Sequence, residues 1–378
     1  MKKLTLSIFS ILFALSLTFG LGNAVAVNAS DGETTTDYLE VSVTLTEDIT
    51  FNFIVSGATG YEKARIDFAY LDGKTASEEV ILSNGGGTIS FDKLPPQYMS
   101  ENLTVTLALV NSDGTEDVQP AKQVSLRSYA RTVLDKTSAD DAQGRALRKL
   151  VTDMLYYGDA AQNYVFGDSV AAADKATAVL TDAEKKSYAL NEKAEESDYS
   201  LSDNASSDMR WVRYGAKFDS RLGVFFEFIA KEEENLSVRY DDGTVQSSFE
   251  TRKETVNGKE ITVYKSIKYL SVLNFGKKIT ARLYAGDKAI GSPITYSVNS
   301  LTFDFASDTK EYALAIAAAT YASSAVDYKN GVGYYYFEAE DERTALTNSK
   351  SSTVGKLKRE STFVGNLSGN TGAVIEYS

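Results

Sequence analysis

The chain of 378 residues contains neither cysteine nor histidine. Without them, Ser-His-Asp and Cys-His catalysis, histidine-ligated zinc and thiol redox chemistry are excluded within this chain. A disulfide framework and a lipid-modified cysteine anchor are excluded too, so stability has to come from large hydrophobic cores. The chemistry that remains is carboxylate catalysis, calcium binding through oxygen ligands, and recognition by aromatic or polar surfaces.

Long apolar runs are also scarce, and the one that stands out lies at the N-terminus. Two lysines follow Met1, residues 4–19 are apolar apart from scattered Ser and Thr, and Ala24-Val25-Ala26 forms a small-residue cleavage signal. The alternative is a membrane anchor, but a span needs about 20 apolar residues. We therefore predict a cleaved signal peptide over residues 1–26 and a protein that is secreted or at the cell surface, with no membrane insertion after cleavage.

Positive charge is in short supply as well. Lys and Arg number 39 against 52 Asp and Glu, and loss of Lys2 and Lys3 with the signal peptide leaves 37, so the mature net charge is -15. Nucleic acids and anionic membranes both require a basic surface on their protein partners. We therefore predict that neither is a partner of this chain.

Residues 35–127 alternate between apolar and polar side chains in the manner of β-strands, beginning with Leu39, Val41, Val43 and Leu45. Turn signals separate the runs, which predicts an antiparallel β-sandwich. A helical segment over residues 128–166 is predicted next, because apolar side chains then advance by four, three, four and three residues. These side chains are Leu150, Met154, Tyr157, Ala161 and Tyr164.

The same order recurs in the second half of the chain. Strand-like runs and turn signals predict a second β-sandwich over residues 206–305, and a helix over residues 306–329 repeats the earlier spacing. Its matching positions are Leu314, Ala318, Tyr321, Ala325 and Tyr328. We therefore predict a mainly β protein with short helical segments, in which two β-sandwich-plus-helix units follow one another in tandem.

Residues 167–205, between the two predicted units, are rich in Ala, Lys, Glu, Asp and Ser and have few large apolar side chains. This composition predicts a linker. Thr181-Asp182-Ala183-Glu184 fits a capping box, which predicts that a short helix begins there.

Parts of the two units resemble a module that recurs in large secreted surface proteins of gut Clostridia and their relatives. The resemblance rests on Arg127-Ser128-Tyr129-Ala130 and on residues 154–164, which include Tyr157-Gly158-Asp159-Ala160-Ala161-Gln162-Asn163-Tyr164. Residues 212–217 and 321–325 resemble the second half of that module. The resemblance implies an extracellular location and this architecture, but it implies no activity.

Several conspicuous residues have a structural interpretation beside a functional one. Tyr157 and Tyr164 suit helix-to-sheet packing, with small Ala160 and Ala161 allowing close approach, and a tyrosine platform for sugars is the alternative. Trp211 is predicted to be a core residue. Neighbours on a strand point to opposite faces, and the acid pairs lie in turn-like contexts, so neither is a credible catalytic pair. These pairs are Asp140-Asp141 and Asp241-Asp242.

Near the C-terminus, Glu338 and Glu340 are two residues apart in the run Tyr334-Tyr335-Tyr336-Phe337-Glu338-Ala339-Glu340-Asp341. In a strand both carboxylates would share one face and repel each other. A calcium ion would relieve this repulsion through oxygen ligands, and an edge strand with both acids in water is the alternative.

The C-terminal segment is similar to the opening of carbohydrate-binding modules of families 6 and 35. The similarity rests on Phe337-Glu338-Ala339-Glu340-Asp341, residues 361–366 and residues 372–377. It implies a jelly roll with a structural calcium site to which Glu338 and Glu340 contribute. Because such modules have about 130 residues, residues 333–378 are predicted to be an incomplete jelly-roll fragment.

Together these features favour a secreted, multi-modular cell-surface protein with a glycan-binding or glycan-targeting role, non-catalytic within this chain, whose partner is a polysaccharide or other glycan. One alternative is the N-terminal part of a glycoside hydrolase or polysaccharide lyase with its catalytic domain beyond Ser378. The other is an adhesion or spacer protein that binds another protein, for which an exposed apolar patch shared by both units would be expected.

Overall fold

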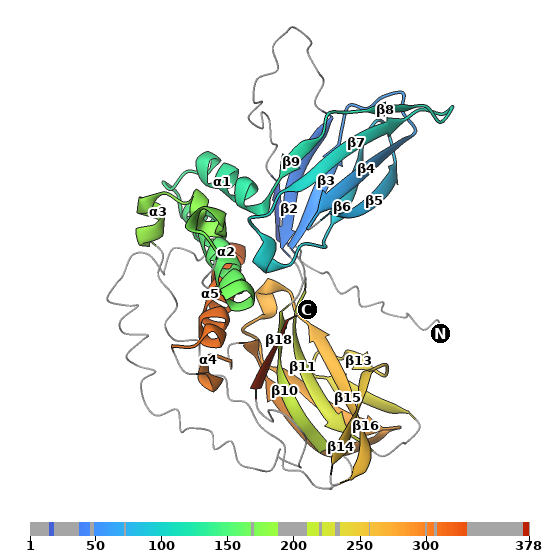
Figure 1. The fold of residues 1–378 in the computed structure, drawn as a ribbon, viewed down its shortest axis with the longest axis vertical. Coiled ribbons are helices and arrows are strands. Elements are labelled where there is room, and N and C mark those ends of the chain that lie inside the picture. Colours follow the sequence, from blue (N-terminus) through green and yellow to red (C-terminus); the bar gives the residue numbers. More distant parts are fainter. Residues whose placement is uncertain are drawn as a thin grey trace, which may run out of the picture.

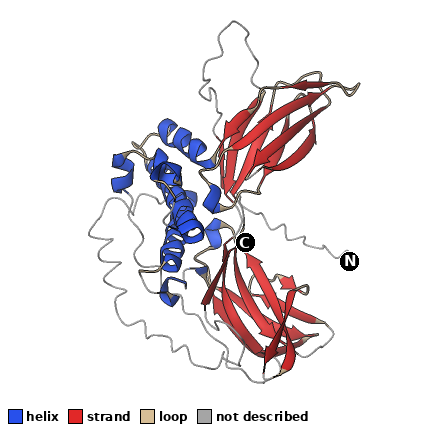
Figure 2. Ribbon diagram, viewed as in Figure 1, coloured by secondary structure: helices blue, strands red, loops and turns tan. Residues whose placement is uncertain are grey.

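The protein is mainly β, and Figure 1 shows its computed structural model. Two sheet-rich bodies lie at opposite ends of the long axis, and the helices gather between them along one side (Figure 2). The structure describes residues 15–18, 38–45, 49–71, 73–167, 170–187, 210–218, 221–230, 235–256, 258–298, 301–305, 308–330 and 373–377.

The first sandwich has one sheet in the order β1-β2-β3-β6 and a second in the order β5-β4-β7-β8, with β9 also pairing with β7. Its inner faces carry the alternating apolar residues, as the sequence predicts, including Phe53, Phe68 and Phe91. The strands are β1 (Leu15–Thr18), β2 (Leu39–Leu45), β3 (Ile49–Val55), β4 (Lys63–Tyr70), β5 (Lys74–Ile81), β6 (Gly87–Phe91), β7 (Leu103–Val110), β8 (Glu116–Val118) and β9 (Lys122–Val124).

The second sandwich has one sheet in the order β14-β15-β11-β10-β18 and another in the order β13-β12-β16-β17. Trp211 is buried, with its ring against Phe226 and Phe228, which confirms the prediction that it belongs to the core. The strands are β10 (Arg210–Phe218), β11 (Leu222–Ile229), β12 (Leu236–Tyr240), β13 (Val245–Gln246), β14 (Glu250–Val256), β15 (Lys259–Tyr269), β16 (Ile279–Ala285), β17 (Lys288–Tyr296) and β18 (Ala373–Tyr377).

Each sandwich is followed in the chain by helices, and the two helices after the first sandwich have starts capped by side chains. Ser125 and Ser128 form a reciprocal capping box at the start of α1, and Asp141 accepts a hydrogen bond of 2.7 Å from the amide of Gly144 at the start of α2. The helices are α1 (Leu126–Lys136), α2 (Ala142–Phe166), α3 (Asp182–Ser187), α4 (Leu301–Asp304) and α5 (Lys310–Asn330). Short 3-10 turns are η1 (Pro96–Tyr98), η3 (Ala172–Asp174), η4 (Ala176–Val179) and η5 (Val272–Asn274).

Helix α2 packs along α5, so the long helices that follow the two sandwiches contact each other. The rings of Tyr157 and Tyr321 are stacked, with centroids 5.6 Å apart and an interplanar angle of 16°. These two tyrosines occupy matching positions in the spacing that the sequence repeats. The prediction that Tyr157 and its neighbours serve helix-to-sheet packing is therefore incomplete, because the principal partner of α2 is another helix.

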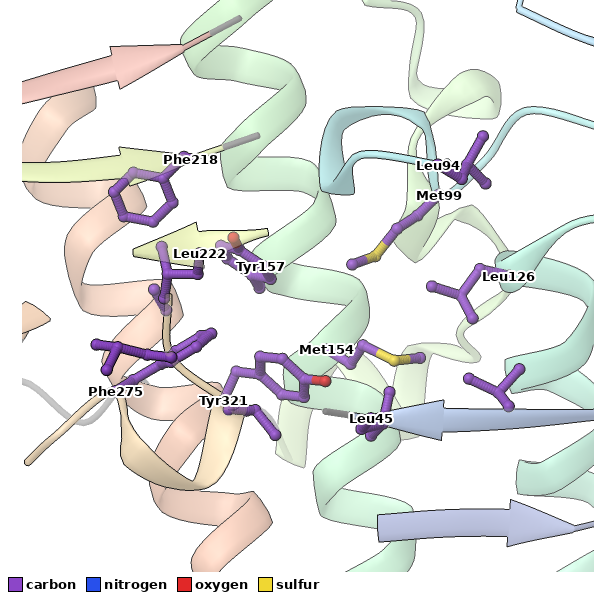
Figure 3. Close-up of a cluster of buried hydrophobic side chains, with 14 of the residues drawn as sticks. Leu45, Leu94, Met99, Leu126, Met154, Tyr157, Phe218, Leu222, Phe275 and Tyr321 are labelled. Carbon is purple, nitrogen blue, oxygen red and sulfur yellow. The ribbon is translucent and has the colours of Figure 1, made fainter. Parts of the chain in front are cut away.

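The stacked tyrosines join the cores of both sandwiches (Figure 3). The ring centroid of Tyr157 lies 6.4 Å from that of Phe218 at the end of β10, and the ring centroid of Tyr321 lies 6.4 Å from that of Phe275, next to η5. On the other side, Met154 of α2 points toward Leu45 at the end of β2. One continuous cluster of buried apolar side chains thus runs from the first sandwich through the helices to the second.

Gly158 allows α2 to approach the turn η1. A Cβ atom at this position would lie 2.6 Å from Sδ of Met99 and 3.2 Å from Cβ of Ala176. A larger residue would therefore have to displace the side chain of Met99 and would crowd Ala176. Ala160 and Ala161, which the sequence suggested for close approach, follow two and three residues later in the same helix.

Part of the predicted linker is packed rather than extended. Ala176, Thr177 and Leu180 are buried. The predicted capping box is confirmed, because the amide of Thr181 donates to Glu184 (2.8 Å) and the amide of Glu184 donates to the Thr181 hydroxyl (3.3 Å). Residues 188–205 of the predicted linker lie outside the described residues.

In each sandwich an edge strand pairs with a strand from a chain terminus: β2 pairs with β1, and β10 pairs with β18. Residues Leu15–Thr18, within the predicted signal peptide, pair antiparallel with β2, and residues Ala373–Tyr377, within the predicted jelly-roll fragment, pair parallel with β10. These two strands are the described parts of those two predicted segments. Of the residues on which the jelly-roll prediction rests, only Ala373–Tyr377 are described, and they form a strand.

We expect Tyr321→Ala to lower the free energy of unfolding by about 3–5 kcal/mol, because it leaves a cavity between α2 and α5. Tyr321→Phe is the matched control: the hydroxyl is buried and has no hydrogen-bond partner among the described residues, so its loss should change stability by less than about 0.5 kcal/mol. Urea unfolding followed by the fluorescence of Trp211 measures both. Equal effects of the two substitutions would contradict the packing role.

Candidate functional site

The predicted calcium ligands Glu338 and Glu340 lie outside the described residues, so the structure does not test them. Within the ranges that the structure does describe, no group of three or more acidic side chains is arranged to hold a metal ion. Three polar clusters among the described residues are therefore the candidate sites. One lies on the second sandwich and two lie on the helices.

A charged network lies on the outer face of the second sandwich. Glu227 of β11 is fully buried between two arginines: Nη2 of Arg252 donates to its Oε2 at 2.7 Å, Nη1 of Arg252 contacts Oε1, and Nη1 of Arg213 is 3.4 Å from Oε2. Nε of Arg252 also donates to Glu254 at 2.7 Å. Both oxygens of Glu227 are thus engaged by cations.

The strand register places this network where it can hold the sheet together. Glu227 alternates with Phe226 and Phe228, which face the core, so it points outward. Arg213 lies directly opposite Glu227 on β10, whereas Arg252 reaches it from β14. Burial alone would lower the pKa of Arg252, but its hydrogen bonds to Glu227 and Glu254 outweigh burial and raise that pKa.

A second cluster lies where α2 meets α5. The carboxylate of Asp153 is almost fully buried, accepts a 2.5 Å contact from Nζ of Lys149 and is also contacted by the hydroxyl of Ser324. Burial raises the pKa of Asp153 in spite of these partners. Burial also raises the pKa of the nearby half-buried Asp327 to about 6, with Lys149 opposing the shift and Asp153 adding to it.

The third cluster explains the polar residues of the segment that resembles surface modules. Asp159 accepts hydrogen bonds from the hydroxyl and, at 3.2 Å, from the amide of Thr177, which ties η4 to α2. Gln162 donates to Oγ of Ser100 at 2.9 Å, which ties the turn after η1 to the same helix. These residues therefore position the connecting segments around α2.

Tyr157 and Trp211 are too buried to serve as open platforms for sugar. Tyr157 is 3 % exposed and Trp211 is 2 % exposed, whereas Tyr164 is half-buried. The sugar-platform alternative therefore fails for Tyr157. The acid pairs dismissed from the sequence also have structural partners, since Asp141 caps α2 and Asp242 forms a 2.6 Å ion pair with Lys268.

Sequence reasoning missed the buried carboxylates Glu227 and Asp153 and the half-buried Asp327. The available signal was a carboxylate within a run of apolar residues, as in Phe225-Phe226-Glu227-Phe228. Such a residue needs a cationic partner, since Glu and Asp are almost never fully buried alone. The arginine that pairs with Glu227 most closely lies 25 residues away in sequence, which the sequence alone does not reveal.

No family model matches this chain, and no curated protein matches it. Among the described helices, none combines the length and the apolar composition of a membrane span. The resemblances to secreted surface modules and to carbohydrate-binding modules therefore remain predictions.

We expect Glu227→Gln to destabilise the protein by about 3–5 kcal/mol, because it leaves two partly buried arginines without their carboxylate. Asp135→Asn, which breaks the exposed ion pair with Arg131 on α1, should cost less than about 0.5 kcal/mol. Thermal and urea unfolding of the two variants measure the difference. Similar stabilities would show that the network contributes no more than a surface pair.

We expect Asp327→Asn to stabilise the protein above pH 7 by about 1 kcal/mol, after allowance for the partial exposure of the side chain. The pKa of Asp327 is raised from 3.8 to about 6 in the folded state, so the folded state binds more protons between those values and stability falls as pH rises through that window. The gain from the substitution should therefore vanish near pH 4.

Unfolding curves between pH 4 and pH 8 measure this effect. Asp287→Asn, at a fully exposed position that pairs with Arg239, is the control and should show no such pH-dependent gain. A gain that stays constant with pH would contradict the assignment to Asp327.

Proposed function

We propose that this chain is a secreted, cell-surface protein with a glycan-binding or glycan-targeting role, non-catalytic in itself, whose two sandwiches act as a carrier. The observation that supports a carrier is the packing of α2 along α5, which gives both sandwiches one continuous core. The glycan-binding part of the proposal rests on the resemblance of residues 333–378 to carbohydrate-binding modules, with a polysaccharide or other glycan as the partner and calcium as a structural ion.

Here a carrier means a rigid body that holds the C-terminal segment at a fixed distance from the N-terminal end of the chain. Interfaces between domains that are small and polar permit relative motion, whereas large apolar ones restrict it. The junction here is built from buried aromatic rings, namely Tyr157, Tyr321, Phe218 and Phe275. This favours a stiff body between the N-terminal and C-terminal segments.

The polar clusters support a non-catalytic role for the described part. A general acid or base needs a carboxylate that can reach a substrate. The carboxylates of Glu227, Asp153 and Asp159 are buried and are occupied by arginine, lysine, serine or threonine partners. The enzyme alternative places its catalytic domain beyond Ser378.

The adhesion alternative predicts an exposed apolar patch shared by both units, and the described surface offers little support for it. Val165 and Phe166 are exposed at the end of α2. The matching positions at the end of α5 are Lys329 and Asn330, so this patch is not repeated. The glycan-binding proposal is therefore preferred to adhesion through a patch shared by the ends of α2 and α5.

Glycan-array binding of residues 27–378, in calcium and in chelator, tests the proposal. We expect any binding of this incomplete fragment to a polysaccharide to be weak, to be weakened further by chelation and to be abolished by Glu338→Gln/Glu340→Gln. Glu232→Gln/Glu234→Gln changes another pair of glutamates with the same spacing and should bind like the parent chain.

If residues 27–378 bind no glycan on the array, the measurement is repeated with a chain that is extended through the coding sequence downstream of Ser378. Binding by the extended chain alone, weakened by chelation, would support a carrier for a complete module. If neither chain binds a glycan, the proposal is overturned. It is also overturned if binding changes neither on chelation nor on substitution of Glu338 and Glu340.

A further inference from the structure

One pair of directly opposed residues in the described sheets carries like charges. Arg239 of β12 lies opposite Arg282 of β16. At the other paired positions that the structure describes, a charged residue faces a neutral residue or an opposite charge, as Glu227 does with Arg213 and Lys265. Directly opposed like charges destabilise a sheet, so this pair is an exception that needs a cause.

Both arginines lie on the outer face of the second sandwich. Their neighbours along the strands, including Val238 and Leu283, are buried in the core, whereas the two arginines are partly exposed. Because side chains alternate between the faces of a sheet, both arginines extend from the same face. Directly opposed Cβ atoms lie about 4.5–5.5 Å apart, so one ligand group can reach both of these long side chains.

The guanidinium of Arg239 is held in place by contacts that leave a donor group unused. Its Cζ lies 4.0 Å from the ring centroid of Tyr284, and its Nη2 donates to the carbonyl of Gly286 (3.2 Å) and to Asp287 (3.3 Å). Asp287 is fully exposed, so this ion pair contributes little. The Nη1 group of Arg239 donates to no described residue and is available to a ligand.

Arg282 has neither a hydrogen bond nor an ion pair with any described residue, although its side chain is only partly exposed. Each other arginine whose side chain the structure describes contacts an acid, a main-chain carbonyl or an aromatic ring. These are Arg65, Arg127, Arg131, Arg145, Arg148, Arg213, Arg221, Arg239 and Arg252. An anionic ligand would supply the partner that Arg282 lacks within the described part of the chain.

The described acids near this pair leave room for such a ligand. Asp287 pairs with Arg239, and the amide of Asp241 donates to the carbonyl of Thr280, two residues from Arg282 (3.0 Å). Both acids are exposed, and neither forms an ion pair with Arg282. The mature chain is negative as a whole, but exposed charges more than about 8 Å away are largely screened at physiological ionic strength.

We propose that Arg239 and Arg282 bind a carboxylate or sulfate group of an acidic polysaccharide on the outer face of the second sandwich. The planar fork of an arginine matches such an oxyanion with two parallel hydrogen bonds. Nucleic acid fits less well, because its closely spaced phosphates require an extended basic groove. The inference rests on the glycan partner of the proposed function, but its site is independent of residues 333–378 and of calcium.

Binding of residues 27–378 to dextran sulfate, carboxymethyl-dextran and unmodified dextran tests the class of ligand, because these polymers share one backbone. We expect no binding to dextran and binding to at least one charged polymer, which identifies the oxyanion. The affinity should fall as the NaCl concentration rises from about 50 to about 500 mM. Absence of binding to both charged polymers, or equal affinity for single-stranded DNA, would overturn the proposal.

Variants that change one charge each test the two arginines. We expect Arg282→Gln to weaken binding about tenfold. Lys74→Gln removes an exposed positive charge from the first sandwich and should bind like the parent chain. Asp287→Asn should bind more tightly, by about twofold to fivefold, because Arg239 loses a competing carboxylate. Equal weakening by Arg282→Gln and Lys74→Gln would indicate general charge attraction and overturn the site.

Thermal unfolding distinguishes a binding role of Arg282 from a structural one. Because the opposed arginines repel each other, Arg282→Gln should not lower the Tm of the ligand-free chain. An excess of the bound polymer should raise the Tm of the parent chain and leave that of Arg282→Gln nearly unchanged. A lower Tm of ligand-free Arg282→Gln would show that this arginine stabilises the fold, and would contradict the proposal.

Chelation separates this site from the C-terminal segment. Neither chelator nor Glu338→Gln/Glu340→Gln should change binding of the charged polymer. If both abolish it, the polymer binds to the C-terminal segment, so this inference fails and the proposed function stands. If binding depends on Arg282 while neither the array nor the extended chain shows calcium-dependent binding, this site stands and the C-terminal site of the proposed function fails.

Discussion

The contact between α2 and α5 is the constraint on which the arrangement of both sandwiches depends. A chain without disulfides must obtain its stability from apolar burial, and each sandwich has an apolar end that needs a cover. Figure 3 shows how one helix pair supplies that cover for both, with Leu45 and Phe218 approaching it from different sandwiches. Helices that follow separate sandwiches in sequence thereby become parts of one core.

Buried charge lies where elements distant in sequence are joined. Glu227 links β11 to β10 and β14, Asp153 faces α5 from α2, and Asp159 fixes η4. A buried ion pair adds little net stability over an apolar contact, but an unpaired buried charge is costly. Misregistered alternatives would leave these charges unpaired, so the clusters favour one arrangement of strands and helices over others.

Local features were predictable because their causes are local. The alternation of apolar and polar residues predicted the strands, and the capping box of Thr181 and Glu184 predicted the start of α3. The core position of Trp211 was also predicted correctly. The sequence also showed that Tyr157 and Tyr321 hold matching positions, yet it could not show that they touch, because 164 residues separate them along the chain. The partners of the buried carboxylates could not be predicted for the same reason, because they are distant in sequence. The predicted calcium ligands, Glu338 and Glu340, lie outside the described residues.

The two terminal strands show what an exposed sheet edge selects. An alternating segment of any origin fits such an edge, since the main-chain hydrogen bonds are the same for every sequence. Selectivity has to come from register, from length and from direction: β1 pairs antiparallel with four residues of β2, whereas β18 pairs parallel with five residues of β10.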